Sequence, residues 1–151
     1  MSCRPAVLWF LLPLVLGGCG RQFTALQEDP LLDVVRIGET FVLAQGEETG
    51  IEGTGLRLRF LLVTEDSRCP RNVNCPTAGS ASILLRTLDE EERPVQFILS
   101  IPGLVPVPYL QNTVVQHRAL RFQLVQLDPY PEHNRPPITQ EEYRAYLIVE
   151  P

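Results

Sequence analysis

The sequence predicts an all-β protein: a single antiparallel β-sandwich or small barrel of about six to eight strands. Apolar residues recur at every second position in several short runs, which is the period of a half-buried strand. The chain also holds 14 Pro and 10 Gly among 151 residues, a turn-rich balance that argues against a helical bundle. With 44% apolar and 21% charged residues, the composition supports one packed core and argues against wholesale disorder.

Residues 1–18 are expected to be a signal peptide rather than part of the fold. Arg4 supplies a positive charge ahead of an unbroken apolar run over residues 6–16. That run is too short for a membrane-spanning helix, which needs roughly 20 residues, but suits the apolar region of a signal peptide. It ends in a tetrad that resembles the lipobox of bacterial lipoproteins, Leu16-Gly17-Gly18-Cys19. The resemblance implies acylation, including palmitate, on Cys19. An ordinary secretory signal cut nearby is the alternative.

This interpretation divides the chain into three parts. After the signal, residues 19–36 are expected to form a lipid-anchored tether that becomes a strand or short helix near residues 31–35, and residues 37–151 form the β domain. Two or more acyl chains hold a protein stably on a membrane, so the lipid is expected to place it at the bacterial cell envelope. Gly20 follows Cys19. In Gram-negative lipoproteins of similar sequence this implies export to the outer membrane.

The body of the chain alternates strands with turns and Pro-rich loops. The Gly- and Glu-rich residues 46–55 are an expected turn. The acidic residues 89–94 are another, and they are expected to join two strands into a hairpin. Residues 102–117 and 128–138 are expected loops, and Thr139 is a candidate cap for one helical turn. Arginines alternating with core residues are expected on the solvent face of a sheet. The expected strands are residues 40–45, 56–63, 81–87, 95–101, 120–124 and 143–149.

The four cysteines divide into two groups. Cys3 leaves with the signal and Cys19 is the expected lipid site, which leaves Cys69 and Cys75 as one pair in an oxidising compartment. We expect a disulfide between them. A zinc site lacks partners, because both histidines lie far along the chain and two thiolates do not complete a tetrahedral site. Two free thiols are the other alternative.

The residues before the first of these cysteines form a candidate structural motif. Asp66 and Ser67 can shape an Asx-type turn, and Arg68 can pin the loop through a carboxylate such as Asp66 or through backbone carbonyls. The expected result is a disulfide-clamped strand crossover. The alternative is a ligand loop in which Asp66, Arg68, Asn72 and Asn74 present polar groups, with calcium as the possible ligand.

This motif resembles a family of small uncharacterised bacterial lipoproteins and exported proteins. The likeness is carried by Glu65-Asp66-Ser67-Arg68-Cys69-Pro70, then Cys75 and Ala78-Gly79, and extends over about residues 41–149. Where the family commonly has Trp just before the Ala-Gly pair, this chain has Thr77. The resemblance implies a fold and an address but no activity.

Charge and composition exclude several functions. The net charge is −5, and all 13 basic residues are Arg, which excludes a basic nucleic-acid binder and any chemistry that needs lysine. His117 and His133 lie in no recognisable nucleophile motif, and no phosphate loop or metal cluster is visible. We therefore expect neither an enzyme nor a bound cofactor or metal.

The remaining expectation is a non-catalytic binding or structural module of the envelope. Tyr109 and Tyr130 in the Pro-rich loops are the candidate surface for a protein partner, because tyrosine gives contact area at low entropic cost. The alternative for the same loops is that their prolines only protect the edges of the sheets from aggregation. A small exported inhibitor of a hydrolase is the alternative function.

Overall fold

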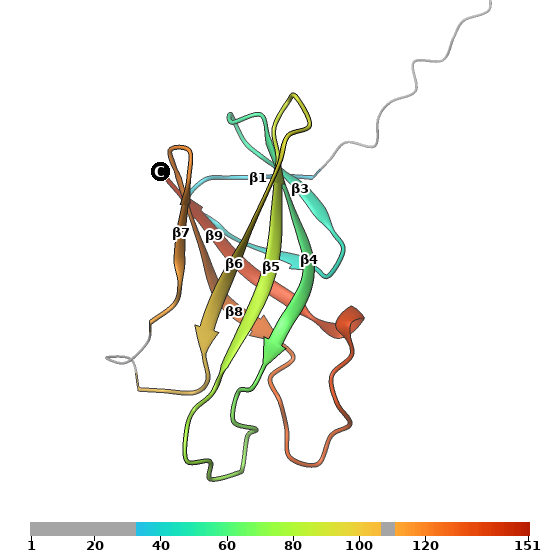
Figure 1. Ribbon diagram of the computed structural model, residues 1–151, viewed down its shortest axis with the longest axis vertical. Coiled ribbons are helices and arrows are strands. Elements are labelled where there is room, and N and C mark those ends of the chain that lie inside the picture. Colours follow the sequence, from blue (N-terminus) through green and yellow to red (C-terminus); the bar gives the residue numbers. More distant parts are fainter. Residues whose placement is uncertain (1–32, 107–110) are drawn as a thin grey trace, which may run out of the picture.

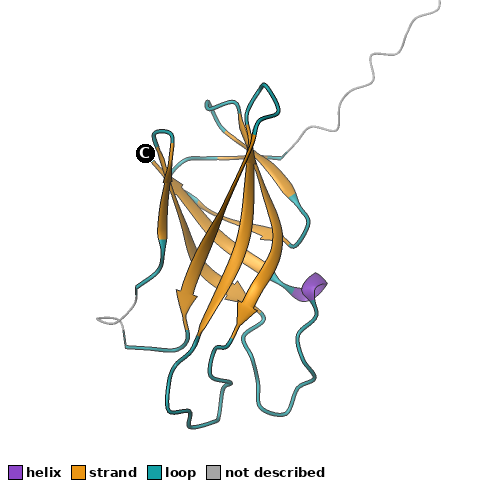
Figure 2. Cartoon of the chain, viewed as in Figure 1, coloured by secondary structure: helices purple, strands orange, loops and turns teal. Residues whose placement is uncertain are grey.

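The computed structural model describes residues 33–106 and 111–151, and within them nine strands form two sheets (Figures 1 and 2). The predicted all-β fold is confirmed. The expected signal peptide, Cys19, most of the tether and Tyr109 lie outside the described residues. The strands are β1 (Val34–Val35), β2 (Thr40–Ala44), β3 (Glu48–Ile51), β4 (Leu56–Asp66), β5 (Ser80–Leu88), β6 (Pro94–Pro102), β7 (Val114–His117), β8 (Leu120–Asp128) and β9 (Arg144–Glu150).

The two sheets pack face to face as a sandwich. One has the strand order β1-β3-β4-β5-β6 and the other has β2-β9-β8-β7. Figure 1 looks onto β4, β5 and β6, with β8 and β9 passing behind them. All pairings are antiparallel except that of β1 with β3, which is parallel. The predicted hairpin is confirmed, because β5 and β6 pair over their whole length around the charged turn.

The core is built from the inward residues of both sheets. Along β4, buried Leu56, Leu58 and Phe60 alternate with the half-buried Arg57 and Arg59, as the sequence pattern predicts. Burying a side chain the size of Leu or Phe stabilises the fold by about 1.5–3 kcal/mol. The largest fully buried apolar side chains are Leu58, Phe60, Ile83, Leu85 and Leu99 of one sheet, and Phe122, Leu124, Leu127, Leu147 and Val149 of the other.

Two segments that were expected to be irregular contain strands. Residues 46–55 are not one turn, because β3 lies within them and buries Thr49 and Ile51 against the core. Gly46 and Gly53, both at positive φ, form separate turns on either side of that strand. Residues 102–117 are likewise not a loop throughout, since their last four residues form β7. Both strands are four residues long, so neither shows enough alternation to stand out from its Gly-, Glu- or Gln-rich surroundings.

A single turn of 3₁₀ helix, Gln140–Glu142, follows Thr139 as predicted. The Glu142 carboxylate accepts a hydrogen bond from the Thr139 backbone N–H at 2.7 Å, and this bond lowers the pKa of Glu142. The Gln140 side chain bonds the backbone N–H and carbonyl of Val63 at 2.9 and 3.0 Å. It thus occupies a stretch of the β4 edge that β3 is too short to reach.

The sandwich has two distinct ends (Figure 1). One end holds β1, the C-terminus and the turns after β3, β5 and β7. There Asp89 accepts hydrogen bonds from the backbone N–H and guanidinium of Arg93 and from Arg118, joining two turns. These donors, led by the Arg93 backbone, lower the pKa of Asp89 to about 2. No helix among the described residues is long and apolar enough to cross a membrane.

Candidate functional site

The opposite end of the sandwich carries the sequence motif. We call residues 67–79, 103–104 and 129–138 the loop end; Figure 1 shows the first and last of these segments side by side below the strands. The backbone ladder continues into it beyond the strands. The N–H groups of Ser67 and Cys69 donate to the carbonyls of Ser80 and Ala78, each at 2.8 Å. The Gly103 N–H donates to Gly79 at 2.9 Å.

The two glycines of this ladder are required by close approach. Gly79 has φ +66°, and a Cβ there would lie 1.8 Å from the Ser67 carbonyl oxygen. A Cβ at Gly103 would lie 2.0 Å from the Ala78 carbonyl oxygen. No real Cβ contact is that short, so both positions need glycine for the segments to pack. Close packing against Ser67 thus explains why the Ala-Gly pair of the motif has glycine at position 79.

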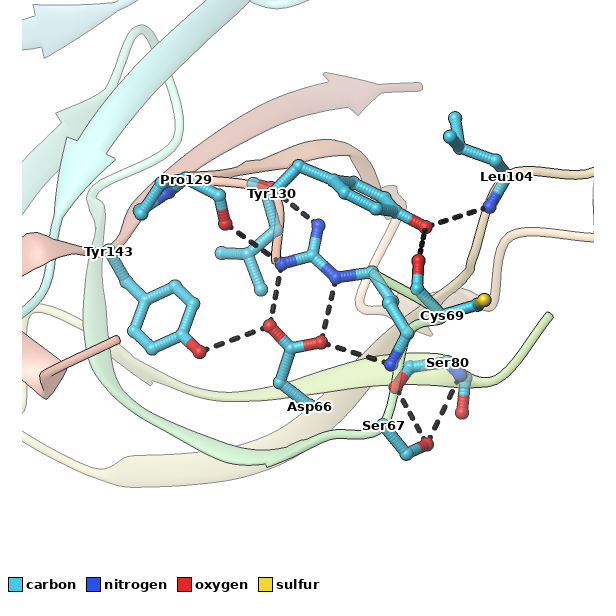
Figure 3. Close-up of polar contacts among 10 residues, drawn as sticks. Asp66, Ser67, Cys69, Ser80, Leu104, Pro129, Tyr130 and Tyr143 are labelled. Atoms are coloured by element: carbon cyan, nitrogen blue, oxygen red, sulfur yellow. Dashed lines mark hydrogen bonds and ion pairs between the residues drawn. The ribbon is translucent and has the colours of Figure 1, made fainter. Parts of the chain in front are cut away.

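A buried ion pair forms the centre of the loop end (Figure 3). The Arg68 guanidinium donates to both carboxylate oxygens of Asp66, from Nε at 2.8 Å and from a terminal nitrogen at 2.6 Å. The two side chains are only 3% and 8% exposed. The Arg68 N–H also donates to Asp66 at 3.3 Å, which closes the predicted Asx-type turn. The prediction that Arg68 pins the loop through Asp66 is confirmed.

The ion pair reaches the other sheet through three further contacts. Arg68 donates to the carbonyl oxygens of Leu127 and Pro129, at 2.7 and 3.1 Å, where β8 ends. The buried Tyr143 hydroxyl, just before β9, donates to Asp66 at 3.0 Å. Burial, reinforced by the Asp66 charge, raises the pKa of Tyr143 to about 12, so this hydroxyl keeps its proton at neutral pH.

Tyr130 connects three loops. Its hydroxyl donates to the Cys69 carbonyl at 3.0 Å and accepts from the Leu104 N–H at 3.1 Å. The guanidinium carbons of Arg68 and Arg71 lie 4.7 and 5.3 Å from the centre of its ring, a cation–π arrangement. The Tyr130 hydroxyl therefore points inward, and the residue is part of the loop-end architecture. We call Asp66, Arg68, Tyr130 and Tyr143 the Arg68 network.

The predicted disulfide between Cys69 and Cys75 is present and closes residues 70–74 into a small loop, of which residues 71–74 are exposed. Asn72 at its tip has φ +66°, a conformation that asparagine tolerates better than most residues. The Arg71 N–H donates to the Pro131 carbonyl at 2.9 Å, which fastens this loop to residues 129–138.

The structure places the four residues of the ligand-loop alternative in two different settings. The Asp66 carboxylate and the Arg68 guanidinium are buried and bonded to each other, whereas the ligand-loop alternative has them present polar groups to a ligand. Asn72 and Asn74 are exposed, as the ligand-loop alternative supposed. Within the described residues no three His, Cys, Asp or Glu side chains cluster as metal ligands.

A hollow of about 340 Å³ lies beside the Arg68 network, between the ends of β6 and β8. Its walls are partly apolar, and Arg68, Arg71 and Tyr130 are among the lining residues. Leu104 and Val125 contribute exposed aliphatic surface to it. The loop end thus offers a surface that combines aliphatic groups, a guanidinium and a tyrosine ring.

Sequence reasoning found the motif but not all its partners. The Tyr143–Asp66 contact joins residues 77 apart and the Tyr130–Cys69 contact joins residues 61 apart, and no local pattern marks either. Tyr109 lies outside the described residues, so the two-tyrosine surface stays a prediction. No protein-family model, curated protein or solved structure shows significant similarity to this chain.

Proposed function

We propose that the chain is a non-catalytic binding module of the bacterial cell envelope, anchored by lipid on Cys19, with the loop end as its binding surface. The observation that carries the proposal is the Arg68 network. Every polar group at its centre is bonded to another part of the protein, so it acts as a support and not as a reaction centre. It fixes three loops relative to one another at one end of a rigid sandwich.

Rigid loops on a sandwich suit recognition. Fixing the surface before binding reduces the ordering entropy that a partner would otherwise have to overcome. The residues that the network leaves exposed include Asn72, Val73, Asn74 and Leu104, and residues 132–137. The loop end also lies opposite β1, where the chain enters the sandwich (Figure 1). An anchor on Cys19 would therefore leave the loop end unobstructed.

Site-specific photo-cross-linking in cells tests this proposal. A photoreactive residue replaces Asn74 or Asn134 at the loop end, and Glu52 at the opposite end serves as the matched exposed control. We expect one common partner to be captured from both loop-end positions and not from Glu52. Absence of a loop-end product, or equal products from all three positions, would overturn the proposal.

Inhibition of a hydrolase is the second candidate, favoured by the disulfide loop. Residues 71–74 are exposed, and the Cys69–Cys75 disulfide holds both ends of their loop, a form that could enter a protease cleft. The test is residual activity of a panel of serine and metalloproteases with equimolar protein, compared with an Arg71→Ala, Asn72→Ala variant. Inhibition that the variant loses would support this candidate, and no inhibition would remove it.

A further inference from the structure

The outer face of the five-stranded sheet carries two adjacent rows of unlike chemistry. Arg59 of β4 pairs directly with Arg86 of β5. In the next row Leu62, Leu84 and Ile98 lie side by side across β4, β5 and β6. We call these five residues the basic-apolar face.

Six of the eleven arginines in the described residues form ion pairs, and Glu48 of β3 lies directly opposite Arg59 in the sheet. Like charges directly opposite each other in a sheet are destabilising. Yet among the described residues neither Arg59 nor Arg86 forms an ion pair. Arg59 donates to the Gly46 carbonyl, and the buried Nε of Arg86 has no hydrogen-bond partner. Neighbouring Arg57, by contrast, is paired with Glu48 and Glu92.

The apolar row is open to solvent. Leu62 is 38% and Ile98 is 48% exposed, and Leu84 between them is half-buried. Five hollows of the described surface are lined by neither Arg59 nor Arg86 nor any of these three aliphatic residues. A surface with guanidinium groups beside aliphatic ones fits an extended anionic, amphiphilic partner better than a small molecule does.

The path of the chain brings such a partner close. β1 lies at the edge of this same sheet, and its exposed Val34 pairs with Gly50 of β3. Residues 20–32, which separate β1 from Cys19, can span at most about 45 Å. A lipid on Cys19 would therefore keep β1, and the sheet whose edge it forms, within about that distance of the membrane surface.

We propose that the basic-apolar face lies against an anionic phospholipid surface, with Arg59 and Arg86 at the phosphates and the aliphatic row at the edge of the acyl region. This inference rests on the proposed envelope location. Each basic residue near an anionic membrane adds to the attraction, and exposed aliphatic groups add contact with the interface. The loop end, at one end of this sheet, stays free for its partner.

Arginine modification by phenylglyoxal, read by mass spectrometry, tests the proposal on the full chain. The protein is mixed with vesicles of phosphatidylcholine alone or with phosphatidylglycerol added. Arg121 and Arg144, on the outer face of the other sheet, are internal controls. We expect modification of Arg59 and Arg86 to slow about threefold or more with phosphatidylglycerol, and the controls to be unchanged. Equal rates in both vesicles, or equal slowing of all four arginines, would overturn the proposal.

Two further arms separate the possible sources of an effect. Soluble glycerol phosphate at the same phosphate concentration should give no protection, and protection by it would point to a small anion and overturn the membrane proposal. Lipidation of Cys19 is tested separately by palmitate labelling. Labelling that persists in Cys19→Ala would refute lipidation at that residue, and it would not change the protection measured at Arg59 and Arg86.

Discussion

Replacing Arg68 by Met should remove much of the stability of the sandwich. The substitution leaves the Asp66 carboxylate buried with only the Tyr143 hydroxyl and a long backbone contact as donors. It also removes the donor to the carbonyls of Leu127 and Pro129. Breaking a buried ion pair by removing one partner costs about 3–5 kcal/mol, because a buried charge is left uncompensated. We expect the free energy of unfolding to fall by about that amount.

Arg121→Met is the matched control for this prediction. Arg121 also pairs with a carboxylate, Glu150, at 2.7 Å, but the two side chains are 50% and 37% exposed. An exposed pair contributes about 0–1 kcal/mol. Urea unfolding of both variants at pH 7, followed by circular dichroism, measures the difference, with an unchanged slope against urea as the check for two-state behaviour. Equal losses of unfolding free energy in the two variants would refute the argument that burial makes the Arg68 ion pair more stabilising than the exposed one.

Three further measurements probe other parts of the fold. Cys75→Ser should lower the free energy of unfolding by about 2 kcal/mol, the chain-entropy estimate for so short a loop, and no loss would contradict a clamping role. Gly79→Ala should destabilise the protein much more than Gly46→Ala. Both glycines have positive φ, but only at Gly79 would the added Cβ meet a backbone oxygen, at 1.8 Å; equal melting temperatures would contradict this. The pKa of Asp89 is lowered to about 2 in the folded protein. Its contribution to the free energy of unfolding is therefore present above the ordinary carboxyl pKa and is lost as pH falls from about 4 to 2. Asp89→Asn should therefore flatten the acid arm of the stability profile, and an unchanged arm would count against the ion-pair role.

The sequence was most informative where apolar alternation is long. Along β4, β5 and β6 the two-residue period predicts strand, inward face and hairpin together, because each run is buried on one side only. The four-residue β3 and β7 were missed because a strand that short shows too few alternations. The parallel pairing of β1 with β3 has no local signal, since it joins segments through tertiary packing.

The candidate site was predictable only where its contacts join residues close in sequence. Asp66 and Arg68 are two residues apart, so their turn and ion pair follow from local chemistry. Tyr130 and Tyr143 reach the same place from segments distant in sequence, and only the folded topology brings their hydroxyls to Cys69 and Asp66. Tyr130 appeared to be a surface residue because its Pro-rich surroundings are typical of exposed loops.

The claim that the Arg68 network holds the loop end rigid is tested most directly by amide hydrogen exchange. The backbone N–H groups of Cys69, Arg71, Gly103 and Leu104 belong to loops but are hydrogen-bonded to other loops or strands. The account predicts that all four exchange far more slowly than unstructured peptide and that Arg68→Met accelerates them together. Exchange at unstructured-peptide rates in the unaltered protein would contradict it.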